Sequence, residues 1–388
     1  MRVVDERNVH RNPHPNHRSE ALSGVTLAWS RVGSEEPVLL CAFRSGSAKM
    51  SQDGRIALRS SRDFGRTWED VPSPFAALPR DPIAAESGPH LGGSAAGTTI
   101  LMACRMWIVS PEDARWNDDA AGVVAADCLA ARAPAGGGWE TARTYDFRRH
   151  ADEWAIPCGP PLALDGGRGP GWIFPMERHA LARVPEWLRR YHAFAVVSRD
   201  DGRTWGDPTP TINDPDGRVV YYDQRMVQLP DGRLLTMAWV HDVVEDVTLT
   251  ARAAYSEDRG LTWSAPFDTG IQGGPVNPLV LADGRILAVF ARRTAPAGIR
   301  AALSEDGGAT WLVRDEFVLW DEATRRVSGE HAASQARAAH GSSLWGTMWG
   351  WTFGTPTAVQ APDGSVLVTF FGAGIDGMAA VRCVRLEL

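Results

Sequence analysis

The sequence predicts an all-β protein, a six-bladed β-propeller whose ring is closed by an N-terminal strand. Three observations carry this prediction. A box of the form S-x-D-x-G-x-T-W recurs along the chain, hairpins join apolar strands through D-G turns, and the two combine into a four-stranded repeat of about 50 residues. With 39 Gly and 26 Pro among 388 residues, the composition supplies the turns that many short strands need.

The recurring box, here called the Asp-box, occupies residues 61–68, 198–205, 256–263 and 304–311. Its Asp side chain can accept hydrogen bonds from turn amides, and its Gly can adopt a positive φ. The Thr begins the next strand, and the Trp is expected to pack between neighbouring sheets. We therefore expect the Asp-boxes to be structural hairpin turns without a catalytic role.

A second element joins two apolar strands through a D-G turn, at residues 226–239, 278–290 and 357–371. The complete repeat reads strand A, D-G turn, strand B, loop, strand C, Asp-box, strand D. It can be laid along the chain as blades at about 21–80, 88–145, 157–212, 219–270, 273–322 and 355–388.

The last repeat ends after its third strand. We therefore expect residues Val3 to Val9 to supply its fourth strand, which closes the ring and removes two exposed sheet edges. The whole chain, 1–388, is expected to form one domain with an insertion at about 322–352.

Composition bounds the partners and the compartment. A formal net charge of -7 gives no global field that would attract nucleic acid or an anionic membrane. The first 20 residues are polar, and no later stretch has the length of a membrane span, so a cytoplasmic location is expected. The cysteines are scattered and contain no CxxC pair, which predicts buried reduced thiols, and neither a metal nor a cofactor is expected.

The strand directions place the functional face opposite the Asp-boxes. Within a blade, the A–B turns and the Asp-boxes share one face, whereas the B–C loops and the D–A connections share the other. That other face receives the long segments 10–20, 110–122 and 322–352. Long loops on one face of a rigid scaffold are where binding sites are usually built.

Charged residues gather at the predicted ends of the B strands. They are Arg44, Arg105, Glu177, Arg178, His241, Arg292 and Arg293. A funnel lined by Arg suits bidentate capture of a carboxylate or sulfate, and the alternative is ordinary salt bridges to neighbouring loops. The start of strand A in the fourth repeat, Tyr221 to Arg225, is the densest polar cluster, and it either lines a water-filled channel or binds substrate.

The Asp-boxes and their hairpin spacing resemble the sialidase superfamily of BNR-repeat propellers across nearly the whole chain. The resemblance implies an Arg before the first strand, near Arg18, and a catalytic acid at Asp53, eight residues ahead of Ser61. A plain D-G turn is the alternative reading of Asp53. Asp223 holds the place of a sialidase Glu, nine residues before the hairpin Gly232.

Two positions depart from the sialidase pattern. Trp239 stands where an Arg is expected, and Thr355 stands where the family has its nucleophilic Tyr. Without that Tyr, the retaining route through a covalent glycosyl-enzyme is lost. Tyr221 and Tyr222 come from a different blade, so the chain is interpreted as a non-classical member.

The leading hypothesis is a glycoside hydrolase that acts on a small or oligomeric sugar bearing a carboxylate. Asp53, Glu177 and Asp223 are its acid–base candidates, with Tyr221 and Tyr222 as further catalytic candidates. The residues expected to bind substrate are Arg18, Arg44, Arg105, Arg178, Arg225, His241 and Arg292.

Two alternatives remain. A lyase or isomerase would use a Tyr or His as base, with Tyr221, Tyr222, His179, His241 and His331 available. A non-catalytic glycan- or protein-binding propeller would instead rely on aromatic residues such as Trp345, Trp349 and Trp351.

Overall fold

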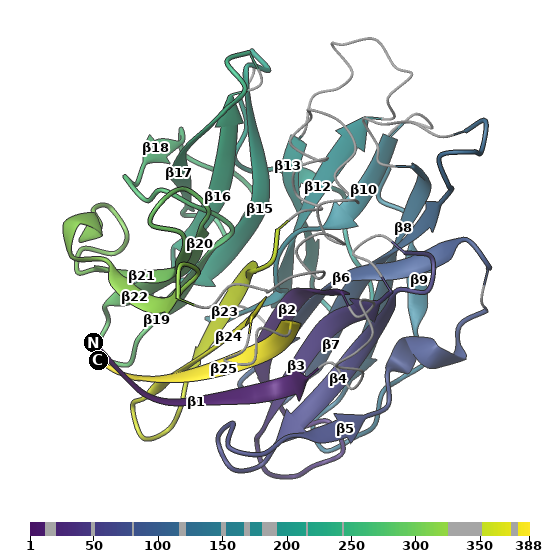
Figure 1. Cartoon of the computed structure of the whole chain (residues 1–388), viewed down its shortest axis with the longest axis horizontal. Coiled ribbons are helices and arrows are strands. Elements are labelled where there is room, and N and C mark those ends of the chain that lie inside the picture. Colours follow the sequence, from purple (N-terminus) through teal and green to yellow (C-terminus); the bar gives the residue numbers. More distant parts are fainter. Residues whose placement is uncertain are drawn as a thin grey trace.

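The computed structural model consists of six antiparallel β-sheets that follow one another in chain order around a central axis (Figure 1). It describes residues 1–11, 21–47, 51–79, 81–115, 122–148, 153–166, 171–180, 192–214, 216–242, 244–324, 351–373 and 379–388. Helical structure in these ranges is limited to 3₁₀ turns such as Pro74–Ala77 and Val313–Asp315. The predicted six-bladed propeller is confirmed.

The first three blades run from an inner to an outer strand in chain order. Blade 1 consists of β2 (Ala21–Ser30), β3 (Val38–Gly46), β4 (Arg55–Ser61) and β5 (Glu69–Val71). Blade 2 consists of β6 (Ala84–Gly93), β7 (Thr99–Ile108), β8 (Val123–Ala133) and β9 (Arg143–Tyr145). In blade 3 the inner strand is interrupted, and its two parts are followed by three further strands: β10 (Glu153–Pro157), β11 (Leu162–Leu164), β12 (Gly171–Ala180), β13 (His192–Ser198) and β14 (Thr209–Pro210).

The last three blades keep the same order. Blade 4 consists of β15 (Val219–Gln228), β16 (Leu234–Asp242), β17 (Val247–Ser256) and β18 (Phe267–Asp268). Blade 5 consists of β19 (Val276–Val280), β20 (Ile286–Arg292), β21 (Gly298–Ser304) and β22 (Phe317–Asp321). Blade 6 consists of β23 (Gly354–Gln360), β24 (Val366–Ala373), β25 (Ala379–Glu387) and β1 (Arg2–Arg11).

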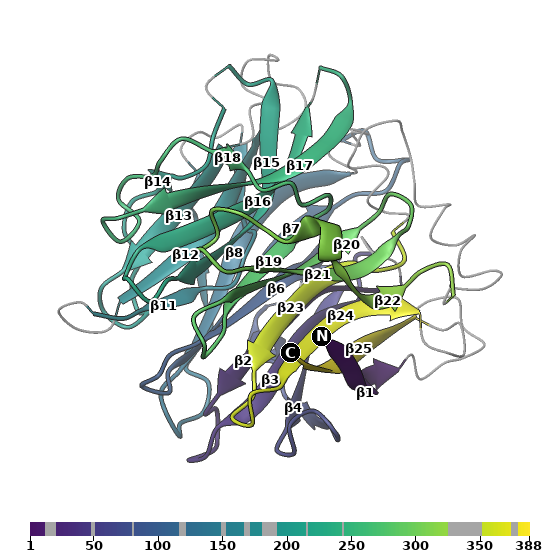
Figure 2. The same ribbon diagram turned by 90° about the vertical axis from the view of Figure 1, so that its left-hand side faces the viewer.

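The N-terminal strand closes the ring as predicted. β1 pairs antiparallel with β25, and the two termini lie side by side in both views (Figures 1 and 2). The buried Arg382 of β25 ties the two strands together, because its guanidinium donates to Glu6 at 2.5 Å and to the side chain of Asn8. The outer edge of β25 is therefore covered by another part of the same chain.

The apolar core lies between neighbouring blades. One cluster joins blades 5 and 6 through residues such as Val289 and Val368, and another joins blades 4 and 5 through Met237 and Phe290. Such B strands are buried on both faces, which explains their nearly continuous apolar sequences. The five cysteines are buried and free, as expected, and no helix in the described ranges has the length and apolarity needed to cross a bilayer.

The four Asp-boxes share one hydrogen-bond pattern. The Ser hydroxyl donates to the Asp carboxylate at 2.8–2.9 Å, and the Thr hydroxyl donates to the same carboxylate at 2.5–2.6 Å. The box glycines have φ between 80 and 91°. A Cβ on Gly260 would lie 2.4 Å from Ile173 of the preceding blade. The glycine is therefore needed both for its backbone conformation and for close contact between blades.

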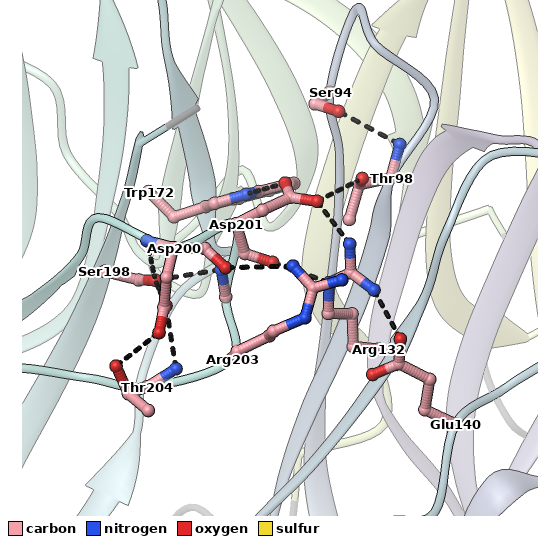
Figure 3. A network of polar contacts seen from close by, with 11 residues as sticks. Ser94, Thr98, Arg132, Glu140, Trp172, Ser198, Asp200, Asp201, Arg203 and Thr204 are labelled. Atoms are coloured by element: carbon pink, nitrogen blue, oxygen red, sulfur yellow. Dashed lines mark hydrogen bonds and ion pairs between the residues drawn. The ribbon is translucent and has the colours of Figure 1, made fainter. Parts of the chain in front are cut away.

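One Asp-box also carries a polar network between blades 2 and 3 (Figure 3). Arg132 of β8 donates its Nε–H to the Asp201 carbonyl at 2.7 Å, and its guanidinium pairs with the carboxylates of Asp201 and Glu140. The Asp201 carboxylate also accepts hydrogen bonds from Thr98 and Trp172, at 2.8 and 3.1 Å. This network fixes the two blades at the face that carries the Asp-boxes.

Candidate functional site

A pocket of about 210 Å³ lies on the propeller axis, and all six blades contribute to its wall. Its residues come from the starts of the inner strands and the ends of the second strands, so it opens on the face opposite the Asp-boxes. The lining residues that carry the argument below are Gly24, Gly88, His90, Glu177, Tyr222, Asp223, Arg225, Trp239, Arg293, Trp351 and Thr355. We call it the axial pocket.

Four inner strands, β2, β6, β15 and β23, carry the same irregularity where they border this pocket. Each pairing skips in register, and the skip contains one residue with a positive φ. Those residues are Gly24, Gly88, Asp223 and Thr355, with φ of 59, 54, 51 and 47°. A left-handed conformation costs a residue with a side chain about 1–3 kcal/mol, and such strain is concentrated at functional sites. The bulges place Asp223 and Thr355 in the pocket wall.

Two carboxyl groups meet in the axial pocket. The backbone N–H of Asp223 donates to Oε1 of Glu177, which comes from β12 in the neighbouring blade. Burial raises the pKa of Glu177 to about 7, although the Asp223 N–H and the charge of Arg225 oppose the shift. Burial also raises the pKa of Asp223 to about 6, against the opposing charges of Arg225 and Arg293. The pair can therefore hold and release a proton near neutral pH.

Two guanidinium groups, the buried one of Arg225 and the partly exposed one of Arg293, face this pair. Nη2 of Arg225 lies 3.7 Å from Oδ1 of Asp223, and the residue is 2% exposed. Arg293 packs on the indole of Trp351, with its guanidinium carbon 3.5 Å from the ring centroid, and it donates to the carbonyl of Gly274. Burial lowers the pKa of Arg293 to about 9, and the Asp223 carboxylate limits this decrease. Arg293 therefore remains a cation at neutral pH.

Aromatic rings and two neutral imidazoles complete the surroundings. Trp239 lies between Tyr222 and Trp351, with ring centroids 5.2 and 5.5 Å apart. Burial and the charge of Arg225 hold the pKa of His90 well below its usual range, and its ring bonds to the Pro157 carbonyl. His179, 3.3 Å from the Glu177 carboxylate, has a pKa lowered by burial to about 3.

In the described ranges no group of three or more His, Cys, Asp or Glu side chains is placed to hold a metal ion. What the axial pocket offers is a carboxyl pair, two cations and aromatic walls. This set can bind an anion and transfer protons.

The match to a known family decides the classification. Residues 125–371 match the model of the BNR repeat-like domain. The chain belongs to the BNR repeat-like family.

Several solved structures share its fold. A protein of unknown function from Dyadobacter fermentans has a TM-score of 0.70 at 19% identity, with coverage of 100% of this chain and 99% of that one. A Hadza microbial sialidase has a TM-score of 0.66 at 16% identity, with coverage of 99% and 68%. The NanB sialidase of Streptococcus pneumoniae has 0.64 at 14%, with coverage of 98% and 70%. These likenesses concern the fold, and no curated protein matches the sequence.

The axial pocket of this BNR repeat-like protein contains four of the predicted site residues: Glu177, Tyr222, Asp223 and Arg225. Tyr221 points to the other side of β15, where it packs in the apolar cluster of Ile212 and Ala238. Arg18 lies outside the described residues, as does most of the predicted insertion, including Trp345, Trp349 and His331.

The remaining predicted residues do not line the axial pocket and contact their own blades. Asp53 accepts hydrogen bonds from the backbone and hydroxyl of Ser47, at 3.1 and 2.9 Å. Burial tends to raise the pKa of Asp53, but hydrogen bonds from Ser51 and Ser47 outweigh it and keep this pKa below its usual value. Arg44 is fully buried and donates to the Ser51 carbonyl at 2.9 Å.

Four further predicted residues form ion pairs. The pairs are Arg105 with Asp127 at 2.9 Å, Arg178 with Glu153 at 2.8 Å, His241 with Asp246 at 3.2 Å and Arg292 with Glu316 at 2.5 Å. These contacts match the salt-bridge alternative to the proposed Arg funnel.

Two pocket residues were missed by the choice of site residues, although the sequence held a signal for each. His90 follows the bulge of β6 as Arg225 follows that of β15, because the segments Ser87 to His90 and Tyr222 to Arg225 occupy the same place. Arg293 directly follows Arg292, and consecutive residues near a strand end point to opposite sides. Aligning the inner strands would have identified His90.

Proposed function

We propose that this protein is a carbohydrate-active enzyme, a glycoside hydrolase that binds a small sugar bearing a carboxylate in the axial pocket. The observation that carries the proposal is the meeting of two carboxyls, the buried Glu177 and the partly exposed Asp223, with two guanidiniums, the buried Arg225 and the partly exposed Arg293. Solved sialidases with this fold, including a Trypanosoma rangeli sialidase in complex with sialic acid, bind acidic sugars.

The charge balance of the axial pocket favours an anionic ligand. With a pKa of about 7, Glu177 is largely protonated below neutral pH, whereas Asp223 with a pKa of about 6 is the more readily ionised of the two. One carboxylate against two guanidiniums leaves a single positive charge. A ligand carboxylate can neutralise that charge, and guanidinium groups bind carboxylates with favourable geometry.

The carboxyl pair supplies the two proton transfers of glycoside hydrolysis. Glu177 donates its proton to the glycosidic oxygen as the bond to the anomeric carbon breaks. Asp223 takes a proton from the water molecule that adds to that carbon. Hydrolysis by direct attack of water needs no tyrosine nucleophile, and it requires the two carboxyls to stand about 6.5–9.5 Å apart, so Glu177 and Asp223 would have to separate to that distance around the substrate. Thr355, at the place of the sialidase tyrosine, is compatible with this route.

Turnover of chromogenic glycosides tests the proposal. We would assay 4-nitrophenyl glycosides of N-acetylneuraminic, glucuronic and galacturonic acid with the wild type and with E177Q, D223N and R293K. R292K is the matched control, since Arg292 pairs with Glu316 away from the axial pocket. The expected result is a decrease in kcat of about 100-fold or more for E177Q and D223N. R293K is expected to raise KM and R292K to leave both constants unchanged.

Other outcomes would contradict hydrolysis. An unsaturated product from a polyuronate would indicate a lyase, and isomerisation of a free sugar would indicate an isomerase. Binding of acidic sugars without turnover would indicate a non-catalytic propeller.

A further inference from the structure

A second hollow, of about 650 Å³, opens on the face that carries the Asp-boxes. It is bordered by the A–B turns of blades 1, 2, 5 and 6, represented by Glu36, Ser94, Ala282 and Gln360. It shares no lining residue with the axial pocket. We call it the Asp-box-face pocket.

An aromatic pair forms part of its wall. The rings of Trp29 and Phe64 lie 6.1 Å apart at an interplanar angle of 71°, and Phe64 is 39% exposed. The indole N–H of Trp29 donates to the carbonyl of Gln360 at 2.9 Å, which fixes the orientation of that ring. The polar group of the indole is thereby satisfied, and apolar ring surface is left toward the pocket.

Phe64 differs from its counterparts in its side chain and not in its backbone, because all four Asp-boxes have a left-handed residue at this position, with φ between 57 and 73°. It has a φ of 57° at the fourth position of its Asp-box, where the other boxes have Asp201, Arg259 and Gly307. Asp201 anchors the network between blades 2 and 3, and Arg259 donates to the Asp165 carbonyl at 2.5 Å. Phe64 has no polar group that could make such a contact, and it exposes its ring. An exposed aromatic ring in the pocket wall, at a position where two other boxes use polar side chains for contacts, points to a ligand.

The polar groups at the rim indicate a neutral ligand. Arg31 and Glu36 carry opposite charges, and both line the pocket. One offers hydrogen-bond donors and the other acceptors, a combination that suits the hydroxyl groups of a sugar. The Gln360 amide is already bonded to Ala282 and Gly364, at 2.8 and 3.0 Å.

We propose that the Asp-box-face pocket binds a neutral sugar residue, with an apolar ring face on Phe64 and Trp29 and hydroxyls directed to Arg31 and Glu36. Aromatic rings supply the large apolar contact and the flanking polar groups supply the orientation. This site is independent of the reaction at the axial pocket. It would bind the neutral sugar units of a glycan and not the sugar that bears the carboxylate.

Saturation-transfer NMR tests this proposal, with methyl glucoside, methyl galactoside, N-acetylglucosamine and maltotriose as probes. The decisive variant is F64G, because glycine accepts the left-handed backbone and should leave the thermal midpoint equal or higher. The control is R259G, which removes a side chain at the same position of another Asp-box. We expect at least one neutral probe to bind the wild type and R259G, and F64G to weaken that binding at least ten-fold.

A further readout separates the two pockets. Binding of the neutral probe should be unchanged in R293K and should not be displaced by N-acetylneuraminic acid. The proposal is overturned if no neutral probe binds at a concentration of about 50 mM, or if F64G binds as the wild type does. Selective binding of a proline-rich peptide in place of the sugars would also overturn it.

Discussion

Replacing Glu177 by Gln should stabilise the protein at alkaline pH, contrary to the usual effect of a buried substitution. Glu177 is 4% exposed, and burial raises its pKa from 4.5 to about 7. The folded state therefore holds the proton more tightly than the unfolded state, and ionisation of Glu177 destabilises the fold as pH rises. A shift of this size corresponds to about 3 kcal/mol once the carboxylate is ionised.

This free energy translates into a measurable change in thermal midpoint. At about 2.1 cal/mol/K per residue, a chain of 388 residues has an unfolding entropy of about 0.8 kcal/mol/K, so 3 kcal/mol corresponds to about 4 °C. The E177Q variant should melt about 4 °C above the wild type at pH 8. The two proteins should melt together at pH 4.5, where Glu177 is protonated in the folded state.

Calorimetry between pH 4.5 and 8 provides the assay, with E153Q as the control. Glu153 is the partner of the buried Arg178, so its loss should lower the thermal midpoint throughout this range. A lower midpoint for E177Q at pH 8, or a difference from the wild type that does not change with pH, would refute the reasoning.

The remaining predictions concern contacts between and within blades. G260A should lose more than about 2 kcal/mol, because it adds a steric overlap to the unfavourable φ, whereas G232A, whose Cβ would meet open space, should lose only about 1 kcal/mol. R132M should cost about 3–5 kcal/mol in urea unfolding, since it leaves the Asp201 carboxylate without its cation. R382M should increase proteolysis of the N-terminal strand before global unfolding, and simultaneous loss of all structure would contradict this.

The fold could be predicted from the sequence because its signals are local. Each Asp-box contains its own hydrogen-bond partners within eight residues, as in Ser61 to Trp68, and each D-G hairpin contains both of its strands. Closure by the N-terminal strand followed from counting strands in the last repeat. The closed ring of blades could therefore be predicted from the repeat alone, without knowledge of long-range contacts.

The site residues were harder to predict from the sequence, because the position of a residue along its strand does not reveal which residue it faces on the next strand. Arg105 and Asp127 are direct cross-strand partners, a relation set by the register of β7 and β8. The same local reasoning could not show that Asp53 is held by its own loop. By contrast, the polar run from Tyr222 to Arg225 was informative, since an innermost strand has no structural need for charged residues.

The bulges of the inner strands hold the information that was missed. Gly24, Gly88, Asp223 and Thr355 occupy equivalent places, and two of them carry side chains in a conformation that favours glycine. Such a bulge is defined by the pairing of the inner strand with the second strand. The number of extra residues in it cannot be predicted from hydrophobic periodicity.

Titration calorimetry with acidic sugars tests the central claim most directly. We would titrate N-acetylneuraminate and glucuronate into the wild type and E177Q between pH 5.5 and 8.5, in buffers of different ionisation enthalpy. If a ligand carboxylate completes the charge of the axial pocket, binding weakens as pH rises through about 7, with proton uptake by the wild type and a smaller pH dependence in E177Q. Absence of binding, or an affinity in the wild type that does not change with pH, would contradict the account.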